Sequence, residues 1–267
     1  MEFLTPEEQA AETKGVSILV AGPFGIGKTS LAKTLPAELL PKACFVKVEN
    51  GTLAIKGLPI ALFSLDTWEE LRNVAAVIGG PNPALPSNAV YSQAHYDSVI
   101  NDPAYSRFPH YDVVFIDSLN AGARFSFIYS EQQPESFSHG KKDLRGTFGL
   151  HARNMVSFLS QLQRAKSKTI IITCGLGYVV DDYNVGTWQL MTEGARTNRE
   201  LPGILDQVIT MQLVDFGDGK PPARAFVCTS PNPWNYPAKD RSGRLDQIEA
   251  PDLGKLLSKL NGNNQGG

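Results

Sequence analysis

A glycine-rich stretch at residues 22–29 carries the clearest chemistry in this sequence. It reads GPFGIGKT and matches G-x-x-x-x-G-K-[ST] at every fixed position. Glycines permit a tight turn whose backbone N–H groups converge on phosphate oxygens, while Lys28 reaches the β- and γ-phosphates and Thr29 ligates Mg²⁺. The alternative is a glycine-rich turn with a surface lysine. The pattern predicts a nucleoside triphosphate site formed by Gly22, Pro23, Phe24, Gly25, Ile26, Gly27, Lys28, Thr29 and Ser30.

Two carboxylates follow apolar runs and supply the other groups that such a site needs. Asp117 ends the run VVFI, which places it at the carboxyl edge of a buried strand, where it can hold Mg²⁺ directly or through water. Glu49 ends the strand after the phosphate loop and its helix. If this strand neighbours the strand that leads into the phosphate loop, Glu49 lies at the same sheet edge as Asp117 and can orient and polarise the water that attacks the γ-phosphate. The alternative is that Glu49 caps the turn before Asn50 and Gly51.

Short apolar runs alternate with helical patterns along the chain. The strands and helices that they predict must position these groups. This alternation predicts an α/β fold with a mostly parallel sheet, covered by helices on both faces. We expect strands at 16–21, 43–48, 60–63, 111–117 and 169–174, helices at 5–14, 28–35, 66–78 and 148–166, and a C-terminal antiparallel hairpin from 207–214 and 224–229. Residues 118–146 and 175–203 show no clear period and are expected to be long loops. We expect a single domain over 1–260 and a disordered tail over 261–267.

The charge balance limits the classes of partner. The 267 residues include 25 Lys and Arg against 27 Asp and Glu, a net charge of −2, which excludes coating of nucleic acid by bulk positive charge. No apolar run is long enough to span a membrane, and the N-terminus lacks the pattern of a secretory signal. Three isolated cysteines inside apolar runs indicate buried thiols. We therefore expect a cytoplasmic protein that contacts no membrane.

The order of these motifs resembles the RecA-fold P-loop ATPases. More closely, the sequence is similar to the small RecA-like ATPases of phages and prophages, including single-strand annealing proteins of the Sak type. The resemblance spans roughly residues 15 to 260 and is carried by GPFGIGKTS, VKVENGTLAIKG, YDVVFIDS, the helix after Phe148 and Gly149, and PAKDRSG. It implies an ATPase that uses ATP and Mg²⁺, self-associates as a ring or filament, and has single-stranded DNA and a single-strand binding protein as partners. The host cytoplasm would be its location.

Two further segments are interpreted through this resemblance. Lys239 and Arg241 lie in KDRSG, which is similar to the Lys-x-Arg segment that reaches the γ-phosphate of an adjacent subunit in related ATPases. A solvated charged turn is the alternative. The sequence departs from the family at the end of the 169–174 strand, where relatives carry Gln, Asn or His as a γ-phosphate sensor. Thr173 and Cys174 stand there, and the cysteine is a poor hydrogen-bonding group.

The two long loops are the expected DNA-binding segments in the RecA resemblance. They interleave cations with aromatic residues, which suits single strands because phosphates need charge and bases need stacking faces. The candidate DNA-binding residues are Arg124, Lys141, Lys142, Arg145, Arg196 and Arg199. Acidic residues in the same loops leave solvated loops or subunit contacts open. A nucleotide-gated assembly or loader protein is the alternative function, and a small-molecule kinase with Arg196 and Arg199 on a lid is the third.

Overall fold

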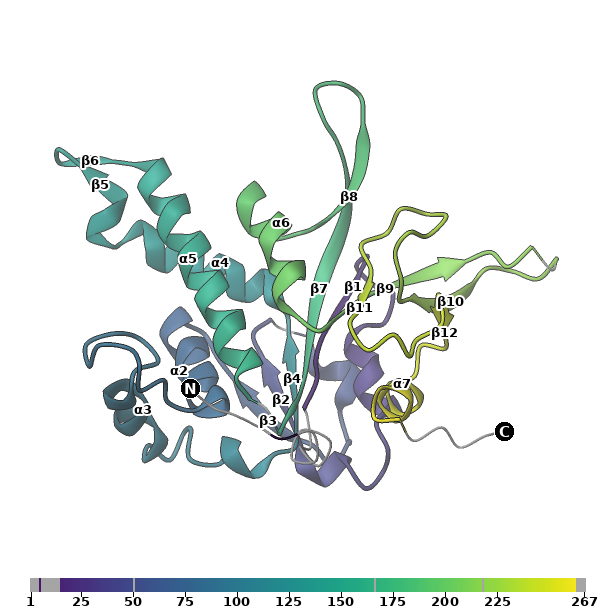
Figure 1. Cartoon of the computed structure of the whole chain (residues 1–267), viewed down its shortest axis with the longest axis horizontal. Coiled ribbons are helices and arrows are strands. Elements are labelled where there is room, and N and C mark those ends of the chain that lie inside the picture. The colour runs from purple at the N-terminus through teal and green to yellow at the C-terminus, as the bar shows by residue number, and fades with distance from the viewer. Residues whose placement is uncertain (1–4, 6–14, 50, 166, 218, 263–267) are drawn as a thin grey trace.

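A mixed sheet forms the centre of the protein (Figure 1). The computed structural model describes residues 5, 15–49, 51–165, 167–217 and 219–262, without the side chains of 195 and 196. Ten strands form the sheet in the order β12-β10-β9-β1-β7-β4-β2-β3, with β11 beside β9 and β8 beside β7. The strands from β3 to β9 in this order are parallel, and β10 is antiparallel to β9. The predicted α/β fold with a C-terminal antiparallel hairpin is therefore confirmed.

The strands agree with most of the expected positions. They are β1 (Ser17–Gly22), β2 (Ala43–Lys47), β3 (Ala61–Ser64), β4 (Val113–Asp117), β7 (Thr169–Val180), β8 (Gly186–Leu190), β9 (Gln207–Val214), β10 (Ala223–Val227), β11 (Lys239–Asp240) and β12 (Ile248–Glu249), with a separate pair β5 (Phe137–Ser138) and β6 (Lys141–Lys142). Because β1, β4 and β2 run parallel, the phosphate loop and both candidate carboxylates leave the sheet at one edge.

The helices cover both faces of the sheet. They are α2 (Trp68–Gly79), α3 (Gln93–Ile100), α4 (Leu119–Glu131), α5 (Leu144–Gln163), α6 (Ala195–Ile204) and α7 (Leu253–Leu260), with short 3-10 turns η1 (Thr29–Thr34), η2 (Leu40–Lys42), η3 (Thr52–Ile55), η4 (Phe108–His110) and η5 (Pro134–Ser136). The predicted helix after the phosphate loop is the short turn η1, which ends at Thr34 with Leu35 as its cap because Pro36 follows. The predicted helix at 5–14, apart from Thr5, and most of the predicted tail lie outside the described residues.

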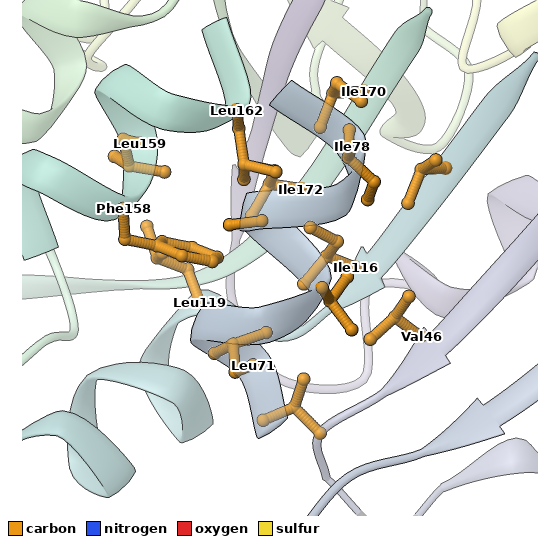
Figure 2. Close-up of a cluster of buried hydrophobic side chains, with 14 of the residues drawn as sticks. Val46, Leu71, Ile78, Ile116, Leu119, Phe158, Leu159, Leu162, Ile170 and Ile172 are labelled. Carbon is orange, nitrogen blue, oxygen red and sulfur yellow. The ribbon is translucent and has the colours of Figure 1, made fainter. Parts of the chain in front are cut away.

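Alternate strand residues pack into two cores, one on each face. Val46, Ile116 and Ile172 point toward α2, α4 and α5, as the cluster in Figure 2 shows. Phe45, Phe115 and Ile171 point the other way, toward η1 and α7. Burial on both faces accounts for the almost unbroken apolar runs of these strands. The phosphate loop and Asp117 are thus carried on rigid strand ends.

Residues 118–146 are not the irregular loop that the sequence predicts, because α4, η5, β5, β6 and the start of α5 occupy most of them. Ser118 caps this helix by accepting a hydrogen bond from the backbone N–H of Ala121. Its buried face consists largely of small and polar residues, Leu119, Gly122, Ala123, Ser126 and Ser130. These positions have helical spacing, but hydrophobic periodicity does not detect a face of glycine, alanine and serine. Leu71 packs beside Gly122, where even a Cβ would lie 2.7 Å from its side chain.

Residues 175–203 are also ordered and not a loop. Strand β7 continues past Cys174 to Val180, turns, and returns as β8, so that a two-stranded hairpin projects from the end of the sheet (Figure 1). Helix α6 then leads back to β9. The expected strand at 169–174 ends too early. The glycines and polar residues after Cys174 interrupt the apolar run, although the strand pairing continues to Val180.

The helix starts predicted from the sequence are close to the observed ones for α2 and α5. Helix α2 begins two residues after the expected start at 66 and has a capping box formed by Thr67 and Glu70. Helix α5 begins four residues before the predicted start, capped by Asp143. All three cysteines are free and buried, as predicted. Among the described residues, no helix is both long and apolar enough to cross a membrane.

Candidate functional site

A cavity of about 310 Å³ lies at the carboxyl edge of the sheet, above β1, β4 and β2. Its lining brings together most of the residues that the sequence predicts, from three separate segments. These are Phe24, Gly25, Gly27, Lys28, Thr29 and Ser30 of the loop after β1, Glu49, Gly51 and Ala54 after β2, Asp117, Ser118 and Asn120 after β4, and Gly175 in β7. The loop needs its glycines, because Gly25 and Gly27 have φ of 77° and 104°, a region that other residues rarely adopt.

Lys28 lies folded over the loop that carries it. Its Nζ donates hydrogen bonds to the carbonyl oxygens of Gly22 at 2.8 Å and Pro23 at 2.9 Å. Burial lowers the pKa of the ammonium, and the carboxylates of Asp117 and Glu49 act in the opposite direction. A cation in a partly desolvated site interacts more strongly with phosphate than one in water. Lys28 can therefore exchange these carbonyl contacts for phosphate oxygens.

The residues expected to hold Mg²⁺ contact one another directly. Thr29 Oγ1 donates to Asp117 Oδ2 at 2.7 Å. The other carboxylate oxygen of Asp117 accepts a hydrogen bond from Thr173 Oγ1, which fixes the orientation of the carboxylate from the neighbouring strand β7. A hydroxyl and a carboxylate are oxygen ligands of the kind Mg²⁺ takes, with waters and phosphate oxygens completing the shell. The pair Thr29 and Asp117 fits this metal.

We expect Thr173 to act through Asp117, because its hydroxyl bonds to that carboxylate. Replacing Thr173 with Val removes the hydrogen bond and keeps the shape of the side chain. The Mg²⁺ concentration needed for half-maximal ATP hydrolysis should rise about 10- to 100-fold, the usual effect of losing a partner of a metal ligand. A magnesium titration of the hydrolysis rate measures this, with the exposed Thr187→Val as control. An unchanged titration curve would remove Thr173 from the site.

Glu49 stands beside the metal pair at the end of β2, which lies next to β4 and not next to β1, the neighbour that the sequence interpretation supposed. Strand β2 pairs with β4 in a register that sets Lys47 opposite Asp117, and the backbone N–H of Glu49 donates to the carbonyl of Asp117 at 3.3 Å. The carboxylate of Glu49 accepts a hydrogen bond from Ser118 Oγ. This contact aims the carboxylate into the cavity. The sequence reasoning named Ser118 as part of the motif but gave it no such role.

A second cavity of about 460 Å³ adjoins the first at the end away from β1. The two share Phe24, Glu49 and Asn120, and the second continues along α4 past Arg124 and Phe125. Glu49 therefore faces both cavities.

Arg224 is a neighbour of the phosphate loop that the sequence reasoning missed. It lies on β10, and its Nη1 donates to the carbonyl oxygen of Ile26 at 3.4 Å. The same nitrogen lies 2.7 Å from where a Cβ on Gly27 would be. No local motif marks Arg224, because only the pairing of β10 with β9 brings it to the loop.

Lys239 and Arg241 lie at the opposite edge of the sheet from the phosphate loop. Lys239 pairs with Val208, which is level with Leu19 in β1. Its Nζ donates to the carbonyl oxygens of Gly203 at 2.9 Å and Leu205 at 2.7 Å, at the end of α6. Arg241 forms an ion pair of 3.0 Å with Asp206. Neither cation can therefore reach the cavity of its own chain.

The candidate DNA-binding cations are spread over the upper part of the molecule in Figure 1. Arg124 lies on α4, Lys141 and Lys142 on β6, Arg145 at the start of α5 and Arg199 on α6, and all of them are exposed. Two have acidic neighbours: Arg124 lies 3.8 Å from Glu193, and Lys142 lies 3.1 Å from Glu131. The side chain of Arg196 is outside the described part. Among the described residues, these cations do not form one continuous patch.

Trp234 and Tyr236, the aromatic residues of the segment between β10 and β11, pack away from the phosphate loop. Tyr236 contacts Trp188 of β8 at 5.1 Å between ring centroids, and Trp234 at 6.2 Å. Both rest against the small cluster of Val214, Ala225 and Val227. Neither lines the cavity at the phosphate loop.

A phosphate loop, a hydroxyl and carboxylate pair for Mg²⁺ and a glutamate at the edge of a parallel sheet define a P-loop nucleoside triphosphatase. The comparison with protein families agrees, since the AAA domain matches residues 14–242. The chain therefore belongs to the AAA domain family. No curated protein matches it.

Three solved structures are similar to this chain at low identity. The KaiC-like protein PH0186 from Pyrococcus horikoshii OT3 is 14% identical, with 80% of this chain and 78% of that one covered and a TM-score of 0.40. The flagellar accessory protein FlaH from Methanocaldococcus jannaschii is 12% identical, with coverage of 80% and 77% and a TM-score of 0.38. The RadB recombinase is 16% identical, with 80% of both chains covered and a TM-score of 0.39.

Proposed function

We propose that this protein is a Mg²⁺-dependent ATPase that self-associates and acts on single-stranded DNA, in recombination or strand annealing of the phage Sak type. One observation carries the proposal. Lys28, Thr29, Asp117 and Glu49, which come from three separate segments, line one cavity at the edge of the sheet. In this arrangement Lys28 binds the phosphates, Thr29 and Asp117 hold Mg²⁺, and Glu49 polarises the attacking water.

The DNA part of the proposal is supported by the projecting hairpin. Strands β7 and β8 extend beyond the nucleotide edge of the sheet and present Tyr178 and Tyr183, whose exposed fractions are 58% and 88%. Aromatic rings on a projecting hairpin offer stacking faces to unpaired bases. β6, the start of α5, and α6, which carry exposed cations, lie on the side of the molecule from which the hairpin projects (Figure 1). These cations can contact phosphates there. A few such cations in each subunit add up in an assembly despite the net charge of −2.

The trans role of Lys239 and Arg241 gives a prediction for assembly. Because both lie on the edge opposite the phosphate loop, they can serve only the site of an adjacent subunit. Mixing Arg241→Ala subunits with wild-type subunits should lower the ATPase rate more than in proportion to the mutant fraction. The change also breaks the ion pair with Asp206, so Asp206→Asn is the control that loses the pair and keeps the cation. Rates that fall in simple proportion would contradict a role in trans.

A nucleotide-gated loader is the second candidate function, favoured by the apolar residues on the same hairpin. Val179, Val180 and Val185 are 48%, 55% and 54% exposed. Apolar side chains in this setting suit contact with another protein. In that function ATP binding would control protein assembly, and hydrolysis would be slow.

Anisotropy of a labelled oligo-dT strand at low salt separates the two functions. The proposed function predicts binding that depends on ATP and Mg²⁺ and weakens as salt is raised. A Tyr178→Ala, Tyr183→Ala double variant should bind more weakly while its ATP affinity is kept. Binding absent in every nucleotide state would overturn the DNA function and favour the loader.

A further inference from the structure

Asn120 occupies the point where the nucleotide cavity meets the root of the β7–β8 hairpin. It lies in the first turn of α4, which begins directly after the Asp117–Ser118 pair. Its side chain lines both cavities, next to Glu49. No motif in the sequence singles it out, because its place depends on α4 starting beside β7.

The oxygen of the Asn120 side-chain amide has a hydrogen-bond partner, whereas its nitrogen has none among the described residues. Its Oδ1 accepts a hydrogen bond of 3.2 Å from the backbone N–H of Gly175. Across the residues that the structure describes, no group accepts a hydrogen bond from its Nδ2. An amide nitrogen carries two donor hydrogens, and a phosphate oxygen only accepts. The free end of the side chain is therefore matched to a terminal phosphate in the cavity.

Gly175 is the residue through which a shift of Asn120 reaches the hairpin. Its carbonyl oxygen accepts a hydrogen bond of 2.9 Å from the backbone N–H of Met191, which closes the ladder at the hairpin root. The site is tight, since a Cβ at Gly175 would lie 3.2 Å from Met191 Cβ and 3.5 Å from Phe24 Cζ. Close packing transmits displacement instead of absorbing it. Asn120 thus accepts from the N–H of Gly175, and Met191 donates to its carbonyl oxygen.

The two side chains that precede Gly175 on β7 offer no free donor to a phosphate in the cavity. The hydroxyl of Thr173 donates to Asp117, and Cys174 is fully buried and lines neither cavity. Burial also raises the pKa of the Cys174 thiol to about 12, so the thiol stays protonated. Asn120 of α4, unlike Thr173 and Cys174, therefore has a donor that can reach a phosphate in the cavity.

We infer that Asn120 senses the γ-phosphate and passes the nucleotide state to the β7–β8 hairpin. This rests on the proposed ATP site. With ATP bound, Nδ2 donates to the γ-phosphate while Oδ1 keeps its hold on Gly175, so the hairpin root is fixed. With ADP bound, the donor end has no phosphate partner, and the amide and the hairpin root move more freely.

Amide hydrogen exchange across residues 175–191 of the full chain tests this inference, with Mg²⁺ and either ATPγS or ADP. In the wild type, exchange should be slower with ATPγS by about 5- to 100-fold, the range of ordinary coupling between sites. In Asn120→Ala the two nucleotides should give the same exchange rates. Its ATPγS affinity should fall by about 10- to 100-fold, the value of one hydrogen bond to a charged group. Asn101→Ala, at the end of α3, is the matched control and should behave as wild type.

Asn120→Asp provides a second variant with a different signature. It retains the acceptor for Gly175 but replaces the donor with a negative charge that faces the phosphate. The ratio of ATPγS affinity to ADP affinity should therefore fall, while the hairpin stays protected with either nucleotide. A purely structural role would leave that ratio unchanged. The inference is overturned if Asn120→Ala keeps the wild-type contrast, or if the wild type binds ATPγS and shows no contrast. If the wild type binds no ATPγS at all, the proposed function itself has failed.

Discussion

Replacing Lys28 with Ala should abolish ATP hydrolysis and weaken nucleotide binding. Lys28 is the motif cation of the phosphate loop; its ammonium donates to the backbone carbonyls of Gly22 and Pro23 and lies 5.7 Å from the ring centroid of Phe24. A charge-assisted hydrogen bond contributes about 1.5–3 kcal/mol, which corresponds to a loss of about 10- to 100-fold in ATP affinity. Loss of the stabilising charge in the transition state should lower the hydrolysis rate by about a further 100- to 1,000-fold.

The Lys28 variant is measured by isothermal titration with a nonhydrolysable ATP analogue and by phosphate release. Lys33→Ala is the matched control, since Lys33 lies on the same turn η1, is exposed, and does not line the cavity. It should retain wild-type affinity and rate. Because Lys28 caps two loop carbonyls, thermal unfolding of the nucleotide-free variant should also be recorded. A folded Lys28→Ala protein that hydrolyses ATP at the wild-type rate would contradict the site.

Replacing Glu49 with Gln should separate binding from hydrolysis. The amide keeps the size of the side chain and can still interact with Ser118, but it cannot take a proton from the attacking water. Turnover should fall about 100- to 10,000-fold, the usual contribution of a general base, while ATP affinity stays within about threefold because the phosphate contacts are unchanged. Single-turnover hydrolysis with excess enzyme measures the chemical step directly.

Two further variants test the surroundings of Glu49. The exposed Glu38→Gln should be indistinguishable from wild type. Ser118→Ala should lower turnover less than Glu49→Gln does, because it releases the carboxylate without removing it. If Glu49→Gln turns over at the wild-type rate, Glu49 only caps the end of β2, which is the alternative that the sequence leaves open.

The chemistry at the sheet edge could be predicted from sequence because it is encoded locally. The phosphate loop is one continuous segment, and Asp117 and Glu49 each follow a buried strand. Parallel strands deliver their carboxyl ends to one edge, so the order of the motifs is enough to bring the three together. The same reasoning gave β9 and β10 as a hairpin and both faces of the sheet as covered.

The parts that sequence reasoning missed depend on contacts between distant segments. Helix α4 buries Gly122, Ala123 and Ser126, which carry too little apolar surface to produce a hydrophobic period. The β7–β8 hairpin has no clear apolar alternation, because glycines and polar residues are frequent at 175–191. Asn120 and Arg224 reach the site only through strand pairings and helix placement, so no spacing along the chain could reveal them.

The hydrolysis rate as a function of single-stranded DNA concentration tests the central claim most directly. Phosphate release is followed with ATP and Mg²⁺ while oligo-dT is added at low salt, in parallel for the wild type and Lys28→Ala. The proposed function predicts Mg²⁺-dependent hydrolysis by the wild type that rises with DNA and reaches a plateau, and none by the variant. Hydrolysis by the wild type that never exceeds that of Lys28→Ala, at any DNA concentration, would contradict it.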